Sequence, residues 1–168
     1  MHRMARIALT ALAVLAASGT GVLGGGAATA EPAASARTVT LPFAQTLRRC
    51  DFTEFNYVGG SGYARPTGTV RIDGREMVAD IQIATAVPNT RYDVRLIQVP
   101  RSSAASCTIG DPGVSGTVLF TDAAGAGATT VRGPIVSGAT GVWAAVTRPS
   151  AYSQTPAEFY TTDLVVAF

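Results

Sequence analysis

Apolar and polar residues alternate most regularly between residues 77 and 99. In the first half one face carries Met77, Ala79, Ile81 and Ile83, and the other carries Asp80 and Gln82. In the second half one face carries Tyr92, Val94 and Leu96, and the other carries Arg91, Asp93 and Arg95. A period of two with one charged face is typical of a strand half buried against a core. Pro88 and Asn89 interrupt the pattern at a turn, so the stretch predicts a hairpin at the centre of the fold.

Shorter alternating stretches recur along the chain between Gly, Pro and Asp turns. They predict strands at residues 38–43, 50–58, 69–72, 117–121, 128–132, 142–147 and 159–168. The strand at 117–121 is expected to bury Val118 and Phe120. No helical period follows residue 30, so about eight short strands predict an all-β fold, a single antiparallel β-sandwich of immunoglobulin-like type. A small barrel is the alternative.

The turn at Pro88 has a more specific pattern. In residues 86–96, an apolar residue, Pro88, a turn residue, Thr90 and Tyr92 lead into a strand. This run resembles the corner of fibronectin type III and related immunoglobulin-like domains. The resemblance implies a tyrosine corner, in which the Tyr92 hydroxyl bonds to nearby backbone. It implies a fold class and no activity.

The N-terminus has the pattern of a secretory signal peptide. A basic stub at residues 1–6 precedes an apolar stretch at 7–17, and Ala28-Thr29-Ala30 forms an A-x-A cleavage site. We therefore expect a signal peptide at 1–30, a disordered lead-in at 31–37 and one β-sandwich domain at 38–168. The expected location is extracellular or in the cell envelope, with no membrane span in the mature chain.

Charge and residue usage narrow the function. Removing Arg3 and Arg6 with the signal leaves 11 of the 13 basic residues against 11 acidic ones, so the mature chain is close to neutral. This balance gives no reason to expect nucleic acid as a partner. The only histidine is His2, inside the predicted signal, which excludes Ser-His-Asp and Cys-His catalysis and His-ligated metals from the mature chain. We expect no enzyme activity and no cofactor.

The chain has two cysteines, Cys50 and Cys107. In an exported protein two cysteines are expected to form a disulfide rather than to remain as free thiols. Such a bond should stabilise the fold by roughly 3–5 kcal/mol through the unfolded state.

Aromatic residues mark the candidate binding sites. The segment 50–65 combines Phe52, Phe55, Tyr57 and Tyr63 with a Gly-rich loop and Arg65, a mixture suited to sugar stacking or a protein contact. The alternative is that Phe52 and Phe55 are core residues and only the tyrosines reach solvent. Trp143 lies among small residues and fits either a core position or an exposed anchor.

Charged residues give weaker candidates. Asp80, Arg91, Asp93 and Arg95 predict a charged outer face with cross-strand pairs, which is either solvated or binds a partner. Asp111 and Asp122 could supply oxygen ligands to Ca²⁺, but their sequences are typical of turns, and we expect no metal site.

Taken as a whole, the chain resembles small exported proteins of actinobacteria, mycobacteria especially, to which no activity is assigned. The resemblance rests on the Ala-rich signal, the absence of Lys, residues 122–127 and the ending 156–163. The function expected is a secreted, non-catalytic binding module with a protein or glycan partner at the envelope. The alternatives are a small β-barrel for an apolar or carbohydrate ligand, and a glycan-active enzyme using two of Glu54, Glu76 and Glu158.

Overall fold

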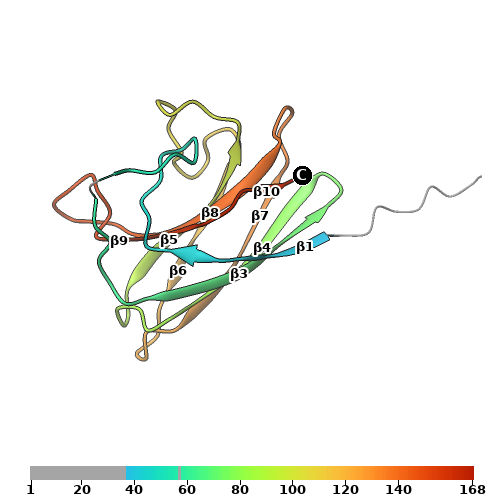
Figure 1. Ribbon diagram of the computed structural model, residues 1–168. Coiled ribbons are helices and arrows are strands. Elements are labelled where there is room, and N and C mark those ends of the chain that lie inside the picture. Colours follow the sequence, from blue (N-terminus) through green and yellow to red (C-terminus); the bar gives the residue numbers. More distant parts are fainter. Residues whose placement is uncertain (1–36, 57) are drawn as a thin grey trace, which may run out of the picture. The chain divides into compact units, whose positions relative to one another are not determined.

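Figure 1 shows the computed structural model, which describes residues 37–56 and 58–168. Within these residues the chain forms ten strands and no helix, so the predicted all-β class is confirmed. The predicted signal peptide lies outside the described residues, as does the lead-in up to residue 36. Arg37, which we placed in the lead-in, is the first residue of a strand.

The strands form two antiparallel sheets. The first sheet has the order β1-β3-β4-β7 and consists of β1 (Arg37–Leu41), β3 (Arg65–Asp73), β4 (Glu76–Ala84) and β7 (Gly127–Pro134). The second has the order β2-β9-β8-β5-β6, with β10 also paired to β8. Its members are β2 (Phe43–Ala44), β5 (Arg91–Val99), β6 (Val114–Phe120), β8 (Gly141–Arg148), β9 (Glu158–Thr162) and β10 (Val166–Ala167).

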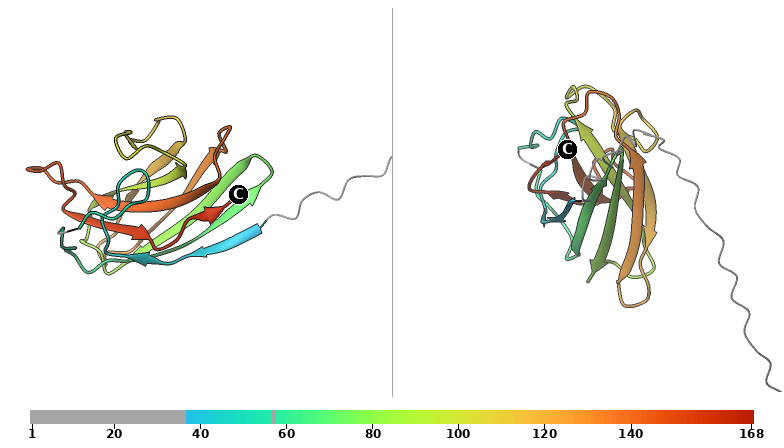
Figure 2. Two further views of the ribbon diagram at one scale, coloured as in Figure 1. Left: turned by 45° about the horizontal axis from the view of Figure 1, so that its top comes forward. Right: turned by 90° about the vertical axis from the view of Figure 1, so that its right-hand side faces the viewer.

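The hydrophobic core lies between the two sheets. The inward positions of β4 are Met77, Ala79, Ile81 and Ile83, and those of β5 are Tyr92, Val94 and Leu96, as their alternation predicts. All seven are at most 3% exposed. The views in Figure 2 show the strands of the first sheet side by side and the second sheet packed against them. The two sheets are separate and do not close into a barrel. The structure therefore agrees with the predicted sandwich and not with the small barrel.

The predicted central hairpin is wrong, although both of its strands exist. β4 pairs with β3 and β7, whereas β5 pairs with β6 and β8, so the two strands belong to different sheets. Residues 85–90 form an arch from one sheet to the other. The expected cross-strand charge pairs are therefore absent. Asp80 accepts a hydrogen bond from Thr130 Oγ1 on the first sheet, and Asp93 pairs with Arg91 on its own strand.

Four other strand predictions change. Residues 159–168 form two strands, β9 and β10, with an interruption between them, rather than one. Residues 38–43 are divided at Pro42, where the chain passes from β1 in the first sheet to β2 in the second. The described part of 50–58 is a loop whose only pairing is the isolated bridge between Arg48 and Glu54. In β6 the core residue is Leu119, whereas Phe120 is 69% exposed. Each side chain of β6 therefore lies on the face opposite to the predicted one.

The second sheet is also covered on its outer face. The loops around Cys50 and Cys107 lie over it, and the predicted disulfide between these residues is confirmed. Beneath the loops is a smaller apolar cluster of Ile97, Val114, Trp143 and Ala145, with Phe52, Val99, Cys107 and Val165 packed against it. The domain thus has one core between its sheets and a second, smaller one under a disulfide-linked cover.

Candidate functional site

The disulfide cover leaves a hollow between itself and the second sheet. The hollow has a volume of about 370 Å³, within the lower part of the range of roughly 300–1,000 Å³ that is usual for small-molecule sites. We call it the cover pocket. Its apolar lining comes from the loops, from β5 and from β8, and includes Leu47, Phe55, Val58, Ile97, Trp143 and Ala145. Its polar lining includes Arg48, Arg95, Thr147 and Thr161.

The floor of the cover pocket follows from strand alternation. In β8 the side chains of Val142, Ala144 and Val146 point into the main core, which turns Trp143 and Ala145 outward. Trp143 is nevertheless only 2% exposed because the cover lies over it. The ring of Phe52 packs on it with centroids 5.6 Å apart at 60°.

The buried polar atoms around this pocket are unusual. In the described part of the chain, four buried side-chain nitrogen or oxygen atoms have no hydrogen-bond partner, and all four are N–H donors. Three of them, Arg48 Nε, Arg95 Nε and Trp143 Nε1, belong to residues that line the cover pocket. Leaving a buried donor unpaired costs roughly 1–3 kcal/mol. Three residues of the pocket lining thus each carry a buried donor that lacks an acceptor.

Arg95 is the central charged group of the site. Its Nη1 donates to the backbone carbonyl of Cys107 at 3.1 Å and its Nη2 donates to Thr147 Oγ1 at 3.3 Å. Among the described residues, no carboxylate lies within ion-pair distance of Arg95. Burial lowers the pKa of the Arg95 guanidinium, and the nearby Asp93 acts in the opposite direction. Asp93 itself is held by Arg91 at 2.8 Å.

Arg48 differs from Arg95 in this respect. Its Nη2 pairs with Glu54 Oε1 at 3.1 Å, and its guanidinium carbon lies 4.2 Å from the centroid of the Phe52 ring. The Arg48 side chain is 9% exposed, whereas that of Glu54 is 56% exposed. Its charge is thus compensated at the rim of the cover, and only its Nε lacks an acceptor.

A second hollow continues from the cover pocket along the outer face of the sheet. Its volume is about 410 Å³, and it shares Arg95, Thr147, Gln154 and Pro156 with the cover pocket. Ser150 and Ser153 of the loop between β8 and β9 lie on its far side. Arg95 therefore lies where a mainly apolar hollow meets a more polar one.

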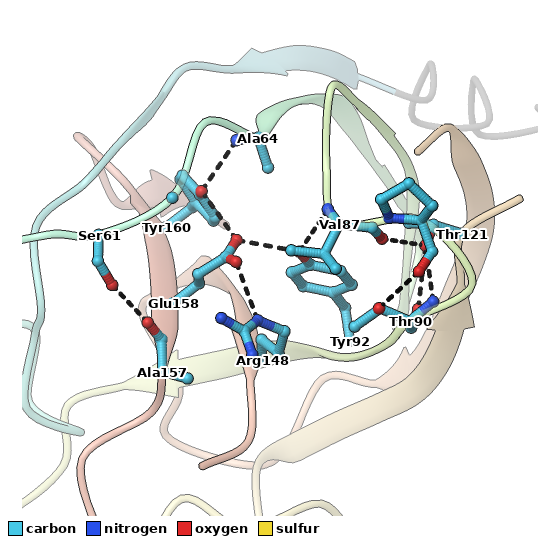
Figure 3. A network of polar contacts seen from close by, with 12 residues as sticks. Ser61, Ala64, Val87, Thr90, Tyr92, Thr121, Arg148, Ala157, Glu158 and Tyr160 are labelled. Carbon is cyan, nitrogen blue, oxygen red and sulfur yellow. Dashed lines mark hydrogen bonds and ion pairs between the residues drawn. The ribbon is translucent and has the colours of Figure 1, made fainter. Parts of the chain in front are cut away.

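A separate buried polar network closes one end of the main core (Figure 3). Glu158 is 2% exposed, and its Oε2 accepts hydrogen bonds from the hydroxyls of Tyr92 at 2.9 Å and Tyr160 at 3.2 Å. Its Oε1 accepts from Arg148 Nε at 2.9 Å. The backbone amide of Ala64 donates to the Tyr160 hydroxyl at 3.0 Å, which ties the network to the start of β3. Each side chain named here has its partners inside the fold.

The protonation of Tyr92 reflects this setting. Burial raises the pKa of Tyr92 to about 12, and the adjacent Glu158 carboxylate adds to the rise, whereas the amide of Val87 lowers it. Burial also raises the pKa of Tyr160. Both hydroxyls are therefore held protonated, as donors to the carboxylate.

Gly62 is required where the chain passes over this network. Its φ is +101°, a conformation that residues with a side chain rarely adopt. A Cβ built at this position would lie 2.5 Å from Glu158 Cδ. Gly62, in the Gly-rich loop of the candidate binding segment, thus lies directly over a buried carboxylate.

The residues of the predicted corner share a set of hydrogen bonds, also drawn in Figure 3. The amide of Val87 donates to the Tyr92 hydroxyl at 3.3 Å, and Thr90 Oγ1 donates to the carbonyl of Pro88 at 2.8 Å. Thr121 Oγ1 accepts from the amide of Thr90 at 2.9 Å. These bonds hold the arch between β4 and β5.

The structure does not bring the predicted binding residues together. Tyr57 lies outside the described residues. Tyr63 is 84% exposed, and Arg65 lies at the start of β3, at the edge of another shallow hollow shared with Gln82. Trp143 is buried under the cover on the other sheet. Of Tyr63, Arg65 and Trp143, therefore, only Trp143 belongs to the cover pocket, which Phe55 of the aromatic segment also lines at 40% exposure.

The carboxylates suggested by sequence are also dispersed. Glu54 pairs with Arg48 on the cover, Glu76 is exposed at the start of β4, and Glu158 is bound to an arginine and two tyrosines. Asp111 accepts from the amide of Thr108, and Asp122 accepts from those of Ala124 and Ala126, as turn residues do. Within the described residues, no three His, Cys, Asp or Glu side chains form a group able to hold a metal.

Sequence reasoning missed Arg48 and Arg95 as site residues. Arg95 appears in the sequence as one member of an alternating charged face, which is the usual pattern of a solvated strand. The one available signal was the unequal count on that face, where two arginines flank a single aspartate, Asp93. Whether Arg91 or Arg95 forms an ion pair with Asp93 depends on side-chain geometry, which the sequence does not show.

Comparison with known proteins gives no relative from which to transfer a function: no family model matches the chain, and no curated protein or solved structure matches it significantly. The part of the chain that the structure describes contains no helix long and apolar enough to cross a membrane. The site is therefore argued from its own geometry.

Proposed function

We propose that this protein is a secreted, non-catalytic binding module of immunoglobulin-like type that takes its ligand in the cover pocket. One observation carries the proposal, namely that three of the four unpaired buried donors belong to residues around one apolar hollow. Buried polar groups in folded proteins are nearly always hydrogen-bonded, and exceptions in one place mark a site that a ligand can complete. The disulfide across the cover and the predicted signal support an extracellular location.

The binding role rests on contrasts within the molecule. The core between the sheets is filled by side chains, so an internal ligand in the manner of a small barrel has no comparable support. The buried carboxylate Glu158 is fully occupied by Arg148, Tyr92 and Tyr160. The cover pocket, in contrast, has apolar walls, and residues of its lining carry buried N–H donors without hydrogen-bond partners.

Fluorescence titration tests this proposal because Trp143 is the only tryptophan of the chain and lies in the pocket. The protein is titrated with 1-octanol, a neutral apolar probe, and we expect a saturable change in Trp143 emission. Ala145→Leu fills part of the pocket and should weaken binding at least tenfold. Phe120→Ser is the control, since it removes an exposed apolar side chain outside the pocket. An unsaturable response, or equal binding by Ala145→Leu, would contradict the proposal.

A further inference from the structure

Resting on the proposed binding function, we infer that the natural ligand is a small organic anion whose acidic group binds Arg95 and whose apolar body fills the cover pocket. The inference names a ligand class that neither the aromatic residues nor the strand pattern suggests.

The first step is the chemistry of the unpaired atoms. Arg48 Nε, Arg95 Nε and Trp143 Nε1 can only donate hydrogen bonds. No Asp or Glu lines the cover pocket. Threonines and Gln154 in the lining can both donate and accept, but the donors without partners need acceptors from a ligand, and a carboxylate brings acceptors only.

The second step is charge. An arginine has five N–H donors, and Arg95 uses two of them, one on Cys107 and one on Thr147. Its neighbour Asp93 pairs with Arg91, and no carboxylate lies within ion-pair distance of Arg95 among the described residues. A largely buried cation without a counter-ion is costly, and an arriving anion removes that cost. Arginine is also the side chain best shaped to bind a carboxylate through two parallel hydrogen bonds.

The third step is the position of this charge. Arg95 lines both the cover pocket and the adjoining hollow, so an acidic group beside it lies where the two meet. Asp93 also lines the adjoining hollow, where Arg91 pairs with it at 2.8 Å. The remainder of the ligand then lies against Ile97, Trp143 and Ala145. A volume of about 370 Å³ admits a short chain or a single ring system rather than a long lipid.

The experiment compares three probes of equal length and different charge, namely octanoate, 1-octanol and octylammonium. Each is titrated into the full-length protein while Trp143 emission is followed, with calorimetry as the second readout. We expect octanoate to bind at least tenfold more tightly than 1-octanol, and octylammonium to bind more weakly than either. Raising the ionic strength should reduce the difference in affinity between octanoate and 1-octanol, because salt screens the charge of Arg95.

Variants identify the residue responsible. Arg95→Met keeps an unbranched side chain about as long as the arginine stem up to Nε and removes its charge, so octanoate should lose its advantage in affinity over 1-octanol. Arg95→Lys, which keeps the charge, should retain a preference for octanoate. Arg132→Gln is the matched control, because it removes one exposed positive charge from β7 on the other sheet and should leave all three affinities unchanged.

The outcomes separate the two proposals. Equal binding of octanoate and 1-octanol by the wild-type protein would overturn the anion inference and leave the pocket standing, as would a preference for octanoate that survives in Arg95→Met. Failure of all three probes to bind would overturn the proposed function itself. If Arg95→Met does not fold, the wild-type comparison and Arg95→Lys still decide the question.

Discussion

Glu158 and Arg95 are charged side chains on opposite faces of the same sheet, and the fold treats them differently. Glu158 points into the core from β9 and is 2% exposed. Its two oxygens accept hydrogen bonds from Arg148, Tyr92 and Tyr160. Arg95 points outward from β5 under the disulfide cover, has no carboxylate within ion-pair distance among the described residues, and leaves its Nε without an acceptor.

The difference separates a structural role from a binding role. A buried charge whose partners all come from the protein fixes how strands and loops meet, because moving any partner leaves the others unpaired. A buried charge with spare donors adds little to stability but is prepared for an anion. Burial and charge alone would make both residues candidates for a site, and only their hydrogen-bond partners distinguish them.

Removing the disulfide should give the largest loss of stability. It should also affect the covered outer face of the second sheet more than its inner face. In Cys50→Ser/Cys107→Ser, we expect a loss of roughly 3–5 kcal/mol in the free energy of unfolding, because the unfolded chain gains freedom. The cover should also loosen, so that Trp143 emission shifts to the red while the far-ultraviolet circular dichroism of the strands is retained. Urea denaturation followed by both signals measures this. Unchanged Trp143 emission would show that the cover holds without the disulfide.

Neutralising Glu158 tests its structural role. Glu158→Gln leaves Arg148 without its counter-charge, and we expect a loss of roughly 2–4 kcal/mol in unfolding free energy, somewhat less than for a fully buried pair because the Arg148 side chain is 32% exposed. Glu76→Gln removes an exposed carboxylate as the control and should change stability by less than about 0.5 kcal/mol. Octanoate binding should be unaffected in both variants. A Glu158→Gln protein as stable as the control would refute the structural role.

Alkaline pH provides a second test of the same network. The folded pKa of Tyr92 is about 12, above the ordinary value of 10, so the unfolded chain releases this proton first as the pH rises. The stability from the protonated hydroxyl is therefore fully present below pH 10 and is lost as the pH rises toward 12. The loss is at most roughly 2–3 kcal/mol for this residue. Urea denaturation between pH 8 and 12 measures it.

The matched variants for this test are Tyr92→Phe and Tyr152→Phe. Tyr92→Phe should show a shallower decline of stability with pH, since the titrating hydroxyl is gone. Tyr152 is fully exposed, so Tyr152→Phe should follow the wild-type curve. Identical curves for all three proteins would mean that Tyr92 does not contribute to the alkaline loss.

Arg95→Met should give the smallest change in stability. The variant loses the two hydrogen bonds to Cys107 and Thr147 but also removes a largely buried, uncompensated charge, and these effects oppose each other. We expect a change within about 1 kcal/mol in either direction. Thermal and urea denaturation without ligand measure it. A loss as large as that of Glu158→Gln would place Arg95 among the structural charges and remove the contrast on which the binding proposal depends.

Much of the fold could be predicted from sequence because strand alternation is local. The alternation around Ile81 and Val94 gave the correct buried faces of β4 and β5, since side chains in a strand point to opposite faces with a period of two. The pairing of Cys50 with Cys107 followed from their number and the expected compartment. In β6, however, apolar residues occupy both faces, and the pattern did not distinguish Leu119 from Phe120.

Sheet membership could not be predicted because it depends on the path of the connections. Residues 85–90 look like a hairpin turn, yet they form an arch, in which the Thr90 amide donates to Thr121 Oγ1, 31 positions away, and Thr121 Oγ1 donates to the carbonyl of Val87. A local pattern carries no information about such a distant partner. For the same reason the sequence did not predict that the chain passes from the first sheet to the second at Pro42.

The sequence by itself determined the class of the fold, the faces of its main strands, its one disulfide and the absence of histidine chemistry after residue 30. The tertiary structure alone decided which charges are satisfied. Glu158 meets Tyr92 across 66 positions of the chain, whereas no carboxylate lies within ion-pair distance of Arg95 among the described residues. Hydrogen-bond satisfaction is a property of positions in space, and for this reason the candidate site is centred on Arg95 under the cover, which the aromatic segment helps to form.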